Sequence, residues 1–145
     1  MTTAEIYGVN SVGKNSFNEF NQITNVIFES TVTEIGESSF YNCEDLTTIT
    51  LPISLETIGN SAFKSSGLKS IDIPSSVTSI GENAFSECSS LNTVTTSRTS
   101  EPETCESTAF DSSITHISVP YDYTSSEFCG RNIMNSGNCG NLCYW

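Results

Sequence analysis

The sequence predicts a right-handed solenoid in which short parallel strands form the concave face, with tight turns and short helical or 3-10 segments on the convex side. Three observations predict this fold. An apolar motif recurs every 22 to 25 residues, the 145 residues suffice for one core and one domain, and 25 Ser, 18 Thr and 13 Asn outnumber the charged residues. Helical bundles, in contrast, usually carry Lys and Glu on their exposed faces.

One phenylalanine marks the same position in every repeat. The column consists of Phe17, Phe40, Phe63, Phe85 and Phe110, at intervals of 23, 23, 22 and 25 residues. A unit of this size cannot bury a phenylalanine by itself, so the neighbouring repeats must cover each ring. The rings are therefore predicted to stack along the axis of the solenoid.

A strand is expected near the end of each repeat. Leu68, Ile71 and Ile73 are separated by three and then two residues, which is typical of a short strand whose alternate side chains face inward. The equivalent segments are 23–28, 46–51, 91–96 and 114–119. Each repeat is therefore predicted to contain one strand, stacked in parallel on the next through a right-handed connection.

The rest of each repeat is expected to form the convex side. Val77, Ile80, Phe85 and Cys88 lie at roughly helical steps, which predicts a tight turn and one short helical or 3-10 segment. Glycine follows the isoleucine column, as at Gly81, and is expected to supply a backbone conformation that other residues resist.

The repeat resembles a known family. Residues 67–88 read GLKSIDIPSSVTSIGENAFSEC and closely resemble the leucine-rich repeat of the BspA type, also called the Treponema pallidum type, and the resemblance covers about residues 9–120. It implies a curved leucine-rich repeat solenoid and a non-catalytic, surface-exposed protein that binds host or matrix proteins or cells. The segment from Ile117 to Gly130, ISVPYDYTSSEFCG, is similar to the closing segment of protozoan members, which favours the protozoan surface-protein branch over a bacterial one.

The chain is predicted to consist of a solenoid of about five repeats, residues 1–120, and a C-terminal cap, residues 121–145. The cap region has no repeat spacing. Its aromatic residues are expected to cover the apolar end of the last repeat, with an aromatic binding patch as the alternative. These residues are Tyr121, Tyr123, Phe128, Tyr144 and Trp145.

Two regions depart from the pattern. Between Thr96 and Phe110 the spacing is longer and acidic, so this turn is expected to bulge outward, either as an acidic loop for a basic partner or as a degenerate repeat. At the other end, residues 1–8 offer no comparable lid, so the strand that ends at Phe28 is expected to present an open edge. This predicts that the chain is part of a longer solenoid or self-associates through its N-terminal end.

The six cysteines fall into two groups. Cys43 and Cys88 share one core column and Cys105 lies in the isoleucine column, so all three are expected to be buried small apolar residues. The cap contains Cys129, Cys139 and Cys143. Two of the cap cysteines could form a disulfide, or all could be free thiols, while their spacing fits no common zinc site, so no metal is predicted.

The outward side chains of the strands are the candidate binding residues. They form two columns on the concave face, Asn25, Thr48, Ser70, Thr93 and His116 in one and Ile27, Thr50, Asp72, Thr95 and Ser118 in the other. Such a face suits polar recognition rather than a deep apolar pocket, although strand-favouring surface threonines would give the same pattern. His116 lies two rungs from Asp72, too far for a carboxylate to orient an imidazole, so no catalytic residue, enzyme activity or cofactor is predicted.

The charge restricts the partners. A net charge of −12 and a pI of about 4.1 argue against nucleic acid, and no apolar run is long enough to insert in a membrane. The resemblance implies non-catalytic adhesion or protein interaction, with a host matrix or cell-surface protein bound on the concave face, and a cell-surface or secreted location. The alternative, favoured by the lack of a signal peptide, is a cytoplasmic structural scaffold that self-associates through its solenoid ends.

Overall fold

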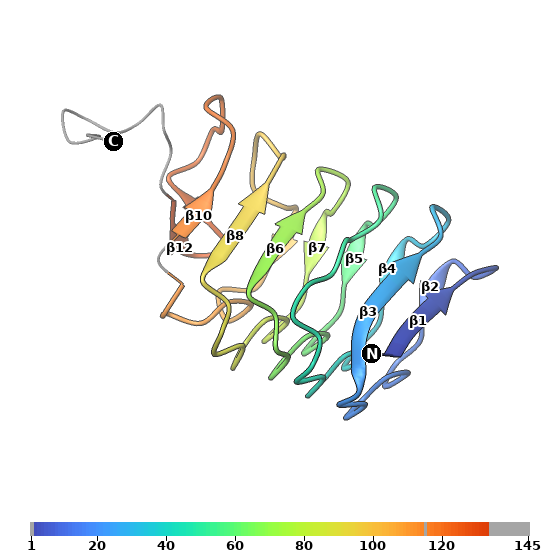
Figure 1. Ribbon diagram of the computed structural model, residues 1–145. Helices are drawn as coiled ribbons and strands as arrows, with labels where there is room; N and C mark the ends of the chain where they lie inside the picture. The colour runs from blue at the N-terminus through green and yellow to red at the C-terminus, as the bar shows by residue number, and fades with distance from the viewer. Residues whose placement is uncertain (1, 115, 134–145) are drawn as a thin grey trace.

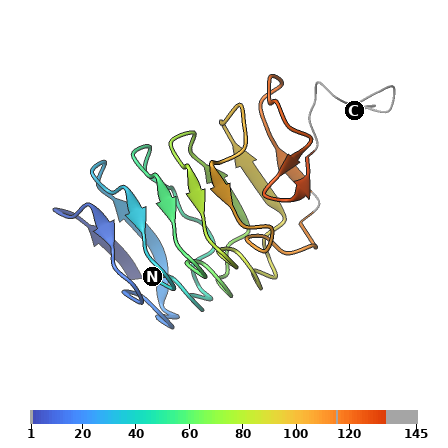
Figure 2. The same ribbon diagram turned by 180° about the vertical axis from the view of Figure 1, so that it is seen from behind.

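The repeats stack as successive rungs of a solenoid with a row of strands on each of two sides (Figure 1). The computed structural model describes residues 2–114 and 116–133. The longer strands form one row, and the view from behind shows a second row of shorter strands (Figure 2). The described residues form the parallel-strand solenoid that the repeat spacing predicts, and they include no helix that is long and apolar enough to cross a membrane.

The longer strands are parallel but form two separate sheets. They are β1 (Thr2–Ile6) and β3 (Ile23–Phe28) in one sheet, and β6 (Ser70–Ile73), β8 (Thr93–Thr96) and β10 (His116–Ser118) in the other. Segment 46–51 occupies the place between β3 and β6 without forming a strand. The strand predicted for the second repeat is therefore absent, and the row is interrupted there.

A third parallel sheet, formed by the shorter strands, was not predicted from the sequence. It contains β2 (Ser11–Val12), β4 (Glu34–Ile35), β5 (Thr57–Ile58), β7 (Ser79–Ile80) and β9 (Thr104–Cys105), paired in that order. Each of these strands has only two residues, too few to show the alternation by which a strand is recognised in a sequence. The prediction of one strand per repeat is wrong, because most repeats contain two.

The phenylalanine column is stacked as predicted. The rings of Phe17, Phe40, Phe63, Phe85 and Phe110 lie 5.2, 5.3, 5.3 and 4.9 Å apart between successive centroids, with interplanar angles of 6° or less. All except Phe17 are completely buried. Each repeat therefore contributes one ring to a continuous core, which single repeats could not build.

The turns on the convex side are not the helical segments that the spacing suggests. Ser61 and Ser65 have φ angles of 53° and 58°, in the left-handed region, so the backbone leaves the helical conformation twice within this turn. As a result the N–H groups of Ser61, Phe63 and Ser65 donate to carbonyls of the next repeat at 2.8 to 2.9 Å. A helix would direct these donors along its own axis, whereas here they join neighbouring repeats.

Glycine after the isoleucine column is required for a different reason from the one expected. Gly59 does not have a left-handed φ angle. A Cβ atom there would lie 2.7 Å from the backbone nitrogen of Glu37 and 2.8 Å from the carbonyl carbon of Gly36. The glycine therefore permits close approach of two repeats at this point, and the prediction of an unusual backbone conformation is wrong.

The N-terminal residues supply a strand that the sequence analysis did not anticipate. Strand β1 pairs in parallel with β3 and places Glu5 beside Ile27. The expected open edge at β3 is therefore covered, and β1 is the outer strand of this two-stranded sheet.

The C-terminal residues pack over the last repeat. Strands β11 (Glu127–Phe128) and β12 (Arg131–Asn132) form an antiparallel pair. The buried ring of Phe128 lies 6.2 Å from Phe110, and the guanidinium of Arg131 donates to the Phe110 carbonyl at 2.7 Å. Tyr123 is also buried, whereas Tyr121 is 80% exposed. The expected contributions of Tyr144 and Trp145 lie outside the described residues.

The longer turn before the last repeat is tied down by Arg98. Its guanidinium donates to the carbonyls of Ser75, at 2.8 Å, and Val77 in the preceding repeat. Glu101 in the same turn is half-buried and accepts a hydrogen bond of 2.9 Å from Ser125. Arg98 and Glu101 are therefore both anchored, so Glu101 is not part of an open acidic loop, whereas Glu103 and Glu106 are exposed.

Candidate binding face

The outward side chains of β6, β8 and β10, here called the strand face, stand in two columns. Pairing in register places Ser70, Thr93 and His116 side by side, and likewise Asp72, Thr95 and Ser118. The two threonines are half-buried and the other four residues are exposed. Alternation along each strand explains the arrangement, because the intervening residues Ile71, Val94 and Ile117 are buried.

Asp72 is the acidic group of the strand face and lies on its edge strand, β6. Its Oδ1 atom accepts a hydrogen bond of 2.8 Å from the hydroxyl of Thr95 on the adjacent strand. This bond orients an exposed carboxylate without burying it. His116 belongs to the other column, and β8 lies between its strand and that of Asp72, in keeping with the separation expected from the sequence.

The predicted columns also include residues of β3 and of the interrupted second repeat. Asn25 and Ile27 are exposed on β3, and Thr48 and Thr50 are exposed on segment 46–51. The latter two join no strand ladder. Glu5 on β1 adds a second carboxylate, which sequence reasoning missed because no strand was expected before residue 9.

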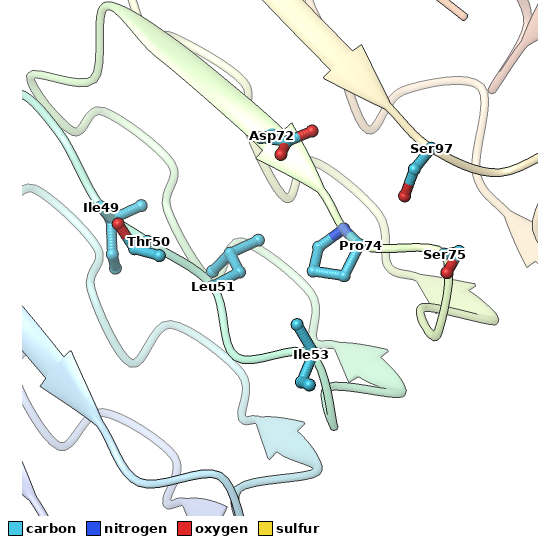
Figure 3. Close-up of a pocket in the computed structure, with 8 residues that line it drawn as sticks. All are labelled: Ile49, Thr50, Leu51, Ile53, Asp72, Pro74, Ser75 and Ser97. Atoms are coloured by element: carbon cyan, nitrogen blue, oxygen red, sulfur yellow. The ribbon is translucent and has the colours of Figure 1, made fainter. Parts of the chain in front are cut away.

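A shallow pocket of about 350 Å³ lies where the row of strands is interrupted (Figure 3). Ile49, Thr50, Leu51 and Ile53 form one side. The other side is formed by Asp72, Pro74, Ser75 and Ser97. The pocket therefore joins an apolar wall to the acidic edge of the strand face.

Ile53 is the pocket residue that sequence reasoning overlooked. Its side chain is 85% exposed in the turn after segment 46–51. The corresponding turn of the next repeat has Ser75. The sequence signal for an exposed apolar contact was therefore the isoleucine at a position where the neighbouring repeat has a serine. Exposed aliphatic side chains beside polar ones often mark a contact surface.

The basic residues are mostly engaged within the molecule. Lys14 pairs with Glu37 at 2.9 Å and Lys64 pairs with Glu87 at 3.2 Å. The guanidiniums of Arg98 and Arg131 donate to backbone carbonyls, and the remaining basic residue, Lys69, is exposed. With a net charge of −12, the surface presents many more free carboxylates than free cations.

The cysteines differ in part from the prediction. Cys43 and Cys88 are buried free thiols, as expected. Burial raises the pKa of the Cys43 thiol to about 11, and it raises the pKa of Cys88 as well. Cys105 is not a free thiol, because it forms a disulfide with Cys129 across a Cα–Cα distance of 5.1 Å.

The disulfide also changes the prediction for the cap. Cys129 pairs with the solenoid rather than with Cys139 or Cys143, which lie outside the described residues. Cys129 follows Cys105 by 24 residues and is followed by Gly130. Cys129 and Gly130 therefore occupy the positions that isoleucine and glycine, such as Ile80 and Gly81, occupy in earlier repeats. Among residues 2–114 and 116–133, no group of three or more His, Cys, Asp or Glu side chains is placed to hold a metal ion.

Comparison with known families identifies the repeat. Residues 10–133 match six copies of the BspA type leucine rich repeat region. The match extends past residue 120, into the segment that was expected to lack repeat spacing. Proteins built from this repeat are generally protein-interaction or surface proteins, and the matches indicate no enzyme family.

Solved structures show the same fold. A leucine-rich repeat protein from Bacteroides ovatus is 28% identical with a TM-score of 0.69, over 85% of this chain and 34% of that one. A leucine rich cell surface protein from Faecalibacterium prausnitzii is 26% identical with a TM-score of 0.72, over 81% and 31%. The T. pallidum leucine rich repeat protein, at 21% identity and a TM-score of 0.50 over 81% and 72%, shares the fold alone.

The chain spans about a third of the length of the first two relatives. No curated protein matches it. The named relatives are bacterial, so the protozoan assignment stays a prediction.

Proposed function

Because the chain belongs to the BspA type leucine-rich repeat family, we propose that it is a non-catalytic module that binds a protein ligand through its strand face. The ligand is a host matrix or cell-surface protein, and the module acts at the cell surface or after secretion. Neither a cofactor nor a metal is needed for this function.

The in-register columns on β6, β8 and β10 carry the proposal. They place exposed hydroxyls, a carboxylate and an imidazole at regular strand spacing on a rigid support. Such groups form adaptable hydrogen bonds without a large change in the protein, which suits recognition of an extended or flat protein surface. The pocket beside Asp72 gives this polar face one apolar contact point.

The proposed location is supported by a relative. The Faecalibacterium prausnitzii protein is a leucine rich cell surface protein. The disulfide between Cys105 and Cys129 is also in keeping with an oxidising compartment. Labelling of intact cells with a membrane-impermeant reagent, followed by recovery of this chain, tests the location; a chain labelled only after lysis would argue against it.

The binding proposal is tested with purified matrix proteins. The chain is immobilised and a panel of such proteins is titrated over it, with Ser70→Arg and Thr93→Arg as strand-face variants. Ser11→Arg on β2 adds the same charge at an exposed serine of the other sheet. The strand-face variants are expected to weaken binding by at least about tenfold, because each places a large side chain in a buried contact. Equal binding by all three variants would move the site elsewhere.

A second candidate is a scaffold that self-associates through its N-terminal end. Tyr7 and Val9 are 58% and 43% exposed, and Phe20 is 44% exposed, so the first repeat presents apolar side chains to solvent. Sedimentation velocity over a range of concentrations tests this function. A dimer that Phe20→Lys dissociates would support it, and a monomer at the highest concentration would exclude it.

A further inference from the structure

We propose that the pocket between segment 46–51 and β6 receives a lysine or arginine side chain of the protein ligand. This inference rests on the proposed function and names the chemistry of the partner at one point of the strand face. It requires an apolar wall for the aliphatic stem of that side chain and an oriented anion for its charged end, and the pocket has both.

The apolar wall fits the stem of a basic side chain. Ile49 and Ile53 on one side and Pro74 on the other line a shallow space of about 350 Å³. Ile53 is largely exposed in the free protein, so covering it removes apolar surface from water. Lysine and arginine have methylene stems that pack on such surfaces while their charged ends remain at the edge.

The anion is the Asp72 carboxylate at the rim of the same pocket. Thr95 donates to Oδ1 at 2.8 Å, which fixes the plane of the carboxylate before a ligand arrives. An ammonium or guanidinium group that reaches the exposed carboxylate forms a charge-assisted hydrogen bond. The hydroxyls of Thr50 and Ser75, also in the lining, offer further acceptors for the same group.

The charge of the protein favours a cation at this place. The guanidinium of Arg98 donates to the backbone carbonyl of Ser75, a lining residue, and to that of Val77, and no ion pair between Arg98 and Asp72 is formed among the described residues. The net charge of −12 adds a long-range attraction for basic partners. An acidic side chain would place a like charge beside Asp72, and a purely apolar one would offer it no hydrogen bond beyond that of Thr95.

The inference is tested on the ¹⁵N-labelled chain with short peptides. The probe is Ac-Gly-Gly-Lys-Gly-Gly-NH₂, and its counterparts have arginine, norleucine or glutamate at the centre. The lysine and arginine peptides are expected to shift the amide signals of Thr50, Asp72 and Ser75 in a saturable manner, with weaker binding at high salt. Norleucine keeps the stem without the charge and is expected to bind at least about tenfold more weakly.

Two variants divide the site into its parts. Asp72→Asn removes the charge and retains an acceptor for Thr95, and it is expected to weaken lysine-peptide binding by about tenfold. Ile53→Ser removes the exposed apolar group and is expected to weaken binding about fivefold. Glu34→Gln, at an exposed position on β4, makes the same change of net charge on the other sheet and is the matched control.

Several outcomes would overturn the inference. They are the absence of saturable shifts at these amides, equal binding of the norleucine and lysine peptides, and equal losses for Asp72→Asn and Glu34→Gln. The proposed function is judged separately, by the matrix-protein titration. If Ser70→Arg weakens that binding and Asp72→Asn does not, the strand face is retained and only the basic side chain in the pocket is rejected.

Discussion

Ser39 is a residue whose side chain does not suit its surroundings. It is completely buried, and its hydroxyl is one of two buried side-chain polar atoms without a hydrogen-bond partner in the described part of the chain. Later repeats have Ala62, Ala84 and Ala109 at this position, all buried. The hydroxyl therefore costs desolvation free energy that an alanine avoids.

Replacing Ser39 with alanine is expected to raise the free energy of unfolding by about 1 kcal/mol, since the unpaired group is removed without leaving a large cavity. Urea denaturation measures the change. Ala62→Ser is the reciprocal variant and should lower the stability by a similar amount. A loss of stability in Ser39→Ala would mean that the hydroxyl has a partner.

Cys43 makes the stability depend on alkaline pH. Burial raises its pKa from 9.0 to about 11, so the folded protein holds this proton more tightly than the unfolded chain does. The resulting stabilisation is fully present below pH 9.0 and is lost as the pH rises toward 11. Cys88, whose pKa is raised as well, acts in the same direction.

The unfolding free energy is therefore expected to fall between pH 9 and 11, and Cys43→Ser should reduce that fall, because serine does not ionise in this range. Serine also keeps a donor for the Phe17 carbonyl, to which the Cys43 thiol donates at 3.1 Å. Parallel urea titrations at several pH values measure the effect. Identical pH profiles for the two proteins would exclude a role for this thiol.

At the scale of elements, the terminal hairpin is attached to the solenoid by three kinds of contact. Phe128 packs near Phe110, Arg131 bonds to the Phe110 carbonyl, and Cys129 is bonded to Cys105. In earlier repeats, the thiols of Cys43 and Cys88 donate hydrogen bonds to the carbonyls of Phe17 and Phe63 in the preceding repeat. At the end of the solenoid, the guanidinium of Arg131 donates the equivalent hydrogen bond to the Phe110 carbonyl. These contacts hold the hairpin of β11 and β12 against the apolar end of the last repeat.

Removal of the disulfide in a Cys105→Ser, Cys129→Ser double variant is expected to lower the stability of the C-terminal repeats by about 3 kcal/mol, through the entropy of the opened loop. Repeats interact chiefly with their neighbours, so the effect should be confined to this end. Hydrogen exchange measures it: amides of β10 to β12 should lose protection, while those of β4 and β5 keep theirs. A uniform loss along the chain would contradict this locality.

The sequence predicts those elements that have a long enough pattern. The phenylalanine column and the strand triplets recur over several repeats, and their side chains stack or alternate as expected. The two-residue strands such as β5 have no pattern of their own, and the turns depend on left-handed residues such as Ser61, which composition does not reveal. Contacts between residues that are distant in the sequence could not be predicted either, as the disulfide between Cys105 and Cys129 illustrates.

The candidate site was predictable to a similar extent. Alternation places Ser70, Asp72 and Thr93 on the outside of adjacent strands, and the structure has them there. The pocket could not be found in this way, because it results from the missing strand at 46–51. Whether segment 46–51 pairs as a strand depends on its hydrogen bonds to the repeats on both sides, and the sequence of that segment alone does not show this.

At the scale of the whole molecule, stability is distributed along the stack of rings. Phe63 lies 5.3 Å from both Phe40 and Phe85 and is completely buried, so its truncation leaves a cavity in the middle of the core. Phe63→Ala is expected to cost about 3 to 5 kcal/mol. Phe17, which stacks against Phe40 and is partly exposed, is the control, and its truncation should cost clearly less. Chemical denaturation compares the two; equal losses would contradict a stack that is continuous through Phe63.

The stacked rings occupy the inside of the solenoid, and binding on the outward side of β6, β8 and β10 is the central functional claim. Hydrogen exchange of the whole chain with and without a bound matrix protein tests it most directly. Protection is expected at β6, β8, β10 and segment 49–53, and not at β4, β5 and β7 on the other sheet. Protection confined to the other sheet or to the N-terminal repeat would contradict the claim.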